Sequence, residues 1–171
     1  MLVYRCEDLI PIGYTDSDFQ LDLDSKKFTS GCVFTLGGGA ITWRSVKQSY
    51  IADYIMEAKY VAACEAIKEA IWLKKFLSDL GVVRIEQVPI TLFCDNSGVV
   101  SQSKGPTNHK KGKHIETKYQ IIRDIIARGD VVVAKIESAN NLADPFIKAL
   151  PQRTFESHLE GMRVKLVHNS L

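Results

Sequence analysis

GCVFTLGGGAITWR, at residues 31–44, consists of two short β-prone runs on either side of three consecutive glycines. This pattern predicts strands at 31–36 and 40–44 joined by a tight hairpin, because glycine adopts the positive φ angles that such turns need. A glycine-rich loop that binds a nucleotide phosphate is the alternative. That loop would need a Lys-Ser/Thr pair and a helix pattern directly after it, and the sequence has neither.

Strand and helix patterns alternate on both sides of this hairpin. Upstream, residues 10–15 are β-prone and lead into Asp16. Downstream, the patterns predict, in order, a helix at 54–80, a strand at 88–94, a short helix capped by Asn96 or Ser97, a helix at 115–126, a strand at 131–136, a helix through 146–150 and more helix at 155–162. The first three strands can pair as an antiparallel meander, and the later two, which helices separate, can pair in parallel. We therefore expect an α/β fold over residues 1–171, in one domain with a five-stranded mixed sheet flanked by helices.

The composition is that of a globular chain with no strong charge bias. Hydrophobic residues make up 46% of it, and the formal net charge is +2, so a nucleic-acid surface would have to be a local patch. The four cysteines, Cys6, Cys32, Cys64 and Cys94, contain no CxxC pair, and we expect reduced thiols in an intracellular protein. The N-terminus has no long apolar run, so we expect neither a signal peptide nor a membrane span.

Four acids stand where the predicted strands end or the predicted helices begin: Asp16, Glu57, Asp95 and Asp144. Side chains at such positions meet at one edge of an α/β sheet. Carboxylates that meet there repel one another, and hard divalent cations such as Mg²⁺, which prefers oxygen ligands, relieve that repulsion. Two ions about 4 Å apart can activate a water molecule and stabilise the leaving oxygen of a phosphodiester. We expect two Mg²⁺ ions, with Mn²⁺ as a substitute, and no small-molecule cofactor.

These acids also have structural interpretations. Glu57 alone could stabilise the helix dipole, and Asp144, which precedes a proline, has the pattern of a helix cap. Asp18 follows Asp16 at strand spacing and would point to the same face. The simpler interpretation is that Asp18, like Asp22 and Asp24, is a solvated turn residue.

The residues around the four acids resemble the ribonuclease H family. The matching motifs are Tyr14-Thr15-Asp16, Met56-Glu57, Phe93-Cys94-Asp95-Asn96-Ser97 and the Asn-x-x-Ala-Asp pattern at 140–144. The copia-type branch of LTR retrotransposons is more similar still, in chain order, at GYTDSDF (13–19), FTSG (28–31), GGGAITW (37–43), EAKY (57–60), AIWL (70–73), CDN (94–96), KHIE (113–116) and LAD (142–144). The resemblance extends from about residue 2 to residue 162.

This resemblance implies the ribonuclease H-like fold and makes Asp16, Glu57, Asp95 and Asp144 the metal ligands. It implies a metal-dependent endonuclease that hydrolyses the RNA strand of RNA–DNA hybrids, with water as the nucleophile and a 3′-hydroxyl on the product. In the parent polyprotein the domain would follow a reverse transcriptase and remove template RNA during DNA synthesis, in cytoplasmic virus-like particles.

The chain also departs from the family pattern. The loop at 137–140 has no histidine, although many cellular members carry one there, and Lys59 stands where copia-type relatives commonly have an acid. An inactive ribonuclease H-like module that binds nucleic acid or connects domains is therefore the alternative function. An integrase or transposase of the same superfold would need its glutamate last, whereas Glu57 here precedes Asp95 and Asp144 is the late acid.

Basic residues cluster between 104 and 123, at Lys104, Lys110, Lys111, Lys113, Lys118 and Arg123. Such a patch suits a phosphate backbone, and by the resemblance some ribonucleases H hold the DNA strand with a basic protrusion here. His114 could join these contacts, and Asn96, Ser97 and Gln102 could donate to RNA 2′-hydroxyls. A solvated loop is the alternative, and a zinc site at His109 and His114 lacks a nearby cysteine.

The remaining histidines and the tryptophans have plain structural interpretations. We expect His158 and His168 on the surface. We expect Trp43 and Trp72 in the core, where Trp72 would help the long helix to cover the sheet.

Overall fold

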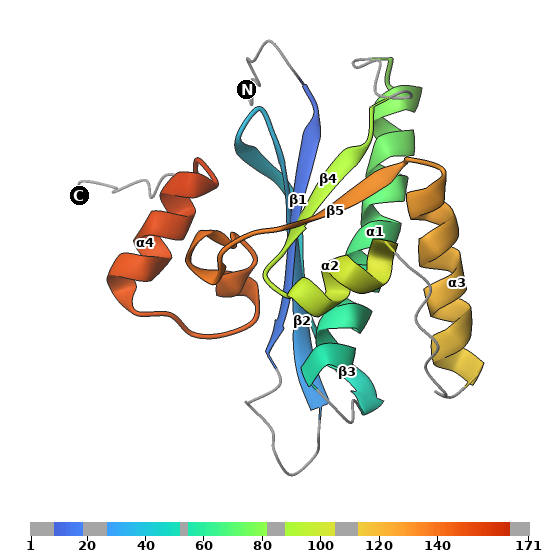
Figure 1. Ribbon diagram of the computed structural model, residues 1–171. Coiled ribbons are helices and arrows are strands. Elements are labelled where there is room, and N and C mark those ends of the chain that lie inside the picture. The colour runs from blue at the N-terminus through green and yellow to red at the C-terminus, as the bar shows by residue number, and fades with distance from the viewer. Residues whose placement is uncertain (1–8, 19–26, 52–54, 82–87, 105–112, 165–171) are drawn as a thin grey trace, which may run out of the picture.

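The computed structural model describes residues 9–18, 27–51, 55–81, 88–104 and 113–164. Its sheet contains, in chain order, β1 (Pro11–Asp18), β2 (Lys27–Leu36), β3 (Gly39–Ile51), β4 (Ile90–Cys94) and β5 (Val131–Lys135). The first three strands form an antiparallel meander, and β4 and β5 extend the sheet in parallel from β1, in the order β3-β2-β1-β4-β5 (Figure 1). The predicted mixed sheet is confirmed, whereas the extent of the domain over all 171 residues stays a prediction.

The hairpin predicted from the glycine run joins β2 and β3. Gly37 and Gly38 form the turn with φ angles of 59° and 80°, in the left-handed region that residues with a Cβ atom rarely adopt. Both strands run further from the turn than their apolar cores suggest, because β2 begins at Lys27 and β3 continues to Ile51.

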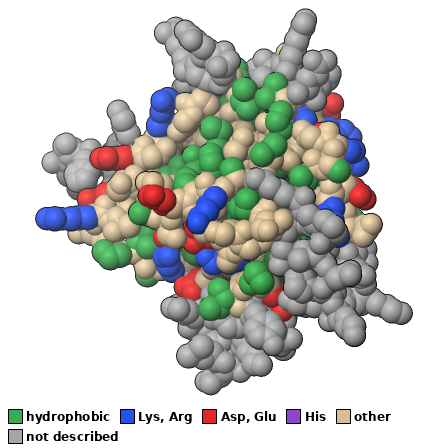
Figure 2. Space-filling model, viewed as in Figure 1, with side chains coloured by type: hydrophobic (Ala, Val, Ile, Leu, Met, Phe, Trp, Pro, Cys, Tyr) green, Lys and Arg blue, Asp and Glu red, His purple; other side chains and the backbone are tan. Residues whose placement is uncertain are grey.

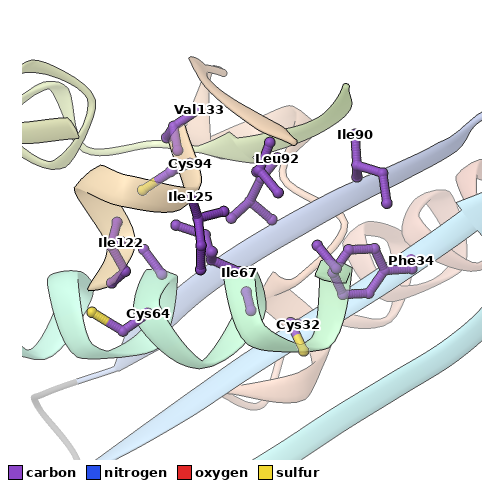
Figure 3. Packing of buried hydrophobic residues seen from close by; sticks show 14 of the residues in the cluster. Cys32, Phe34, Cys64, Ile67, Ile90, Leu92, Cys94, Ile122, Ile125 and Val133 are labelled. Atoms are coloured by element: carbon purple, nitrogen blue, oxygen red, sulfur yellow. The ribbon is translucent and has the colours of Figure 1, made fainter. Parts of the chain in front are cut away.

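Three helices cover one face of the sheet, α1 (Ile55–Asp79), α2 (Ser97–Lys104) and α3 (Lys113–Ala127), and α4 (Gln152–Gly161) lies on its other side (Figure 1). Figure 3 shows Ile67 of α1 and Ile122 and Ile125 of α3 packed with sheet residues such as Leu92. Each fully buried side chain of this size stabilises the fold by roughly 1.5–3 kcal/mol. This core fixes α1 against β1, which carries Asp16, and against β4, which ends directly before Asp95.

The helix predicted through 146–150 is wrong. The chain instead forms two short 3₁₀ turns, η1 (Ser138–Asn140) and η2 (Asp144–Phe146), before α4 begins. Pro145 suits the start of a turn, but Pro151 disfavours helical geometry at the residue before it, so too few residues remain for an α-helix. The helix predicted at 155–162 is confirmed by α4.

The structure also corrects the placement of three rings. Trp43 is 60% exposed on the edge strand β3, and Trp72 is 54% exposed, stacked on Phe76 with ring centroids 5.2 Å apart. Trp72 lies beside the buried Leu73 in sequence, and one residue turns a helix by about 100° away from the buried face. His158, expected on the surface, is buried on α4, and His168 lies outside the described residues.

Cys32, Cys64 and Cys94 are free and buried, and Cys6 lies outside the described residues. Burial raises the pKa of the Cys32 and Cys94 thiols to about 11, so both stay protonated at neutral pH. None of the described helices combines the length and apolarity that a bilayer crossing would require.

Candidate active site

Asp16 and Asp95 meet because β1 and β4 are parallel neighbours. Thr15 lies opposite Cys94 in the register of the two strands, so the next residue of each chain segment, Asp16 and Asp95, emerges at the same edge of the sheet. Asp16 is 4% exposed, and its Oδ1 accepts a hydrogen bond of 2.8 Å from the backbone N–H of Ser17. The Ser138 hydroxyl from η1 donates to Asp95 Oδ2 over 3.1 Å.

An ammonium group joins these two carboxylates. Lys59 Nζ, from the first turns of α1, lies 3.1 Å from Asp16 Oδ1, 2.6 Å from Asp95 Oδ1 and 2.7 Å from Asp95 Oδ2. Burial raises the pKa of Asp16 to about 6, while Lys59 opposes that rise and the charge of Asp95 adds to it. Burial would lower the pKa of Lys59, but its hydrogen bond to Asp95 and the charge of Asp16 outweigh burial and raise it.

Asp144 opens η2 and is 7% exposed. Its Oδ2 pairs with Lys148 Nζ at 2.9 Å, whereas its Oδ1 is buried and has no hydrogen-bond partner among the residues that the structure describes. The cap interpretation is wrong, since Ala143 occupies the N-cap and no side-chain cap bond forms. Burial lowers the pKa of the nearby His158, and the carboxylate of Asp144 opposes that shift.

Asn141 ties this turn to the sheet. Its side chain is fully buried, its Nδ2 donates to the Thr15 carbonyl over 3.1 Å, and its Oδ1 accepts from the Ala143 N–H over 3.2 Å. Asn141 therefore positions the turn that carries Asp144 against the strand that carries Asp16. The sequence patterns pointed to no role for Asn141, although an asparagine three residues before a predicted metal ligand was a usable signal.

Glu57 lies in the first turn of α1 and is 5% exposed. An open cavity of about 300 Å³ lies at this sheet edge, lined by Asp16, Ser17, Asp18, Ile55, Lys59, Asp95, Ser138, Ile147 and Lys148. Asp18 thus shares the site with Asp16, as its strand spacing indicated, whereas Glu57 and Asp144 are not among the lining residues. Within the described part of the chain, no three acidic, histidine or cysteine side chains form a group that could hold a metal ion as they stand.

The donor chemistry nevertheless fits a hard divalent cation. Carboxylate oxygens are the ligands that Mg²⁺ prefers. Asp144 Oδ1 is a buried acceptor without a donor in the described part of the chain, which is a costly state for a carboxylate. Asp16 and Asp95 share a single ammonium group, which shows that two carboxylates at this position are stabilised by a nearby cation.

The predicted nucleic-acid residues are only partly described. Asn96 caps α2, because its Oδ1 accepts from the N–H groups of Gly98 and Val99 over 2.8 and 3.1 Å, and Ser97 opens the helix. Lys110 and Lys111 lie outside the described residues. The side chains of Lys113, His114 and Lys118 also lie outside the description, although their backbone forms part of α3.

On the face shown in Figure 2, acidic and basic side chains of the described residues lie side by side. The basic patch therefore stays a prediction that rests on the segment at 104–123.

No family model matches this chain, but individual proteins do. The transposon TNT 1-94 Pol polyprotein of Nicotiana tabacum is 39% identical over 163 residues, which cover 94% of this chain and 12% of that polyprotein. The Ty1-NL2 Gag-Pol polyprotein of Saccharomyces cerevisiae is 32% identical over 129 residues, 74% of this chain and 7% of the polyprotein. The chain therefore spans a small part of both relatives.

A solved structure supports the fold. LC11-RNase H1, crystallised in complex with an RNA/DNA hybrid, superposes with a TM-score of 0.60 and 19% identity over 80% of this chain and 93% of that protein. The sheet order and helix placement described above agree with this likeness. This chain is a ribonuclease H-like domain related to the Pol polyproteins of copia- and Ty1-type retrotransposons.

Proposed function

We propose that this domain is an endonuclease that hydrolyses the RNA strand of RNA–DNA hybrids during reverse transcription of a retrotransposon. The observation that carries the proposal is the meeting of Asp16 and Asp95 at the carboxyl ends of two adjacent parallel strands. Asp16, Glu57, Asp95 and Asp144 would hold two Mg²⁺ ions, for which Mn²⁺ could substitute. Bound divalent ions would supply an activated water and stabilise the leaving oxygen of the phosphodiester.

The chain's own groups would orient the acids. The Ser17 N–H holds one oxygen of Asp16, and the Ser138 hydroxyl holds one oxygen of Asp95, so both carboxylates present fixed acceptors to the cavity. Asn141 fixes the turn that carries Asp144. Because no covalent bond to the protein is needed, the residues serve to bind, orient and balance charge.

The substrate would lie across this edge of the sheet. Lys110, Lys111, Lys113, His114 and Lys118 would contact phosphates, and Asn96 and Ser97 would donate to 2′-hydroxyls. Phosphate contacts of this kind weaken as salt rises, which gives the proposed binding a measurable signature. In its polyprotein the domain would work beside a reverse transcriptase domain, in cytoplasmic virus-like particles.

The test is cleavage of a labelled RNA–DNA hybrid beside matching double-stranded RNA and DNA, with Mg²⁺ and with EDTA. We expect Mg²⁺-dependent cleavage of the hybrid alone. Asp95→Asn should reduce cleavage at least about 100-fold while hybrid binding persists, because a lost acceptor removes transition-state stabilisation and leaves the surface intact. Asp79→Asn, at the exposed end of α1, is the matched control and should cleave like the wild type. Equal cleavage of all three duplexes would refute the proposal.

One observation favours a second function. Lys59 pairs with both aspartates, and a permanently bound ammonium would leave an inactive module that binds hybrids or connects domains. Binding of the hybrid without cleavage at any Mg²⁺ concentration would favour this alternative.

A further inference from the structure

The ammonium group of Lys59 uses all of its hydrogen-bond donors at the candidate site. An ammonium group has three N–H donors, and Lys59 Nζ lies within 3.1 Å of three carboxylate oxygens, one of Asp16 and two of Asp95. Its donors are therefore all engaged by the two acids. One ammonium of the same molecule is thus shared between two carboxylates and offsets part of their negative charge.

The contact is shielded from water. The side chain of Lys59 is 16% exposed, and those of Asp16 and Asp95 are 4% and 10% exposed. Ion pairs at this depth are screened by salt much less than surface pairs. By contrast, Lys68 on the same helix is 51% exposed and pairs with the partly exposed Glu65. Lys59 is thus a buried counter-ion, whereas Lys68 is an ordinary surface lysine.

A divalent cation held by both aspartates would compete with Lys59, which contacts one oxygen of Asp16 and both oxygens of Asp95. Mg²⁺ binds oxygens at about 2.0–2.1 Å, and like charges repel, so an ammonium and a divalent ion cannot both sit between this pair.

The ammonium group of Lys59 has space to move away from the two acids. Lys59 lines the cavity of about 300 Å³, and its four-carbon stem can rotate the ammonium away from the acids without moving α1. From this geometry we propose that Lys59 is a built-in counter-ion that competes with the divalent cation for Asp16 and Asp95 and is displaced when the cation binds. This inference rests on the proposed function, because it concerns the cation of that same site.

The competition has two measurable consequences. Without divalent ions, Lys59 should stabilise the fold by balancing two crowded carboxylates. With them, it should raise the Mg²⁺ concentration needed for binding. Removing the ammonium while keeping the apolar stem, in Lys59→Met, should separate these effects.

The experiment is thermal unfolding of the full chain in EDTA and across a MgCl₂ titration. In EDTA, Lys59→Met should unfold at a lower temperature than the wild type. As MgCl₂ is added, the variant's melting temperature should rise with a midpoint about tenfold lower in Mg²⁺ than that of the wild type, the size of a typical coupling between two binding events. Lys68→Met should keep the wild-type midpoint.

Two controls separate failure of this inference from failure of the proposed function. Lys59→Gln, which keeps a polar end group but no charge, repeats the test should the methionine variant not fold. A wild-type midpoint in both Lys59 variants would overturn the counter-ion role and leave the metal site standing. No Mg²⁺-dependent rise in the wild type or either variant would overturn the metal site itself, and the inference with it.

Discussion

The side chain of Asn141 offers a sharp test of how the candidate site is held together. It is fully buried, and it satisfies the carbonyl of Thr15 and the N–H of Ala143, which belong to two residues that are themselves fully buried. Asn141→Ala would remove both hydrogen bonds and leave a small cavity. A buried backbone group without its partner costs about 1–3 kcal/mol, and the Thr15 carbonyl has a second lone pair, so we expect a total loss of about 2–4 kcal/mol.

Urea unfolding followed by circular dichroism measures this loss. Asn140→Ala is the matched control, because Asn140 is the exposed neighbour in η1, and its substitution should change stability by less than about 0.5 kcal/mol. If Asn141→Ala costs no more than Asn140→Ala, the proposed anchoring of the Asp144 turn to β1 is wrong.

Three further predictions follow from burial and close contacts. Gly13→Ala would place a Cβ atom 2.6 Å from Phe34 Cε1 and 2.8 Å from Leu92 Cδ1. We expect the free energy of unfolding to fall by about 1–3 kcal/mol and the melting temperature to fall with it. An unchanged melting temperature would contradict the packing of β1. Ile67→Ala, at a residue 1% exposed, should cost about 2–5 kcal/mol in urea unfolding, and a loss below about 1 kcal/mol would contradict its core position. Burial raises the pKa of Asp16 from 3.8 to about 6, so its protonated form stabilises the fold at low pH, and this contribution is lost as the pH rises through 6. We therefore expect the difference in unfolding free energy between the wild type and Asp16→Asn to change between about pH 4 and about pH 7. A difference that stays constant over this range would contradict the raised pKa.

The sheet could be predicted because its signals are local. The glycine run required a turn, and the β-prone stretches on both sides could pair only as neighbours in the chain. The parallel strands followed from the helices between them. The adjacency of Asp16 and Asp95 could then be expected from the sequence, since both acids follow β-prone strand residues.

The predictions of burial were wrong where they relied on residue type and not on the face of the helix that the residue occupies. Trp72 is aromatic but lies on the outward side of α1, and the buried His158 is polar but lies on the inward side of α4. The helix at 146–150 was predicted from apolar residues, although the prolines at 145 and 151 leave room only for a 3₁₀ turn.

The contact of Lys59 with the two aspartates could not be predicted from the sequence for a different reason. The sequence marked it as a departure from the relatives, but its partners Asp16 and Asp95 come from strands far away in the chain. Local patterns cannot reveal such a contact, because it depends on how α1 is placed against the edge of β1 and β4. By contrast, Lys148 pairs with Asp144 four residues earlier in the chain, at a spacing that the sequence itself shows.

Anomalous diffraction from crystals soaked in MnCl₂ tests the account most directly, because it locates the cation without relying on activity. We expect Mn²⁺ peaks about 2 Å from carboxylate oxygens of Asp16 and Asp95, with Lys59 Nζ moved away from both acids. Mn²⁺ bound elsewhere, or Lys59 still between the two carboxylates in crystals saturated with Mn²⁺, would contradict it.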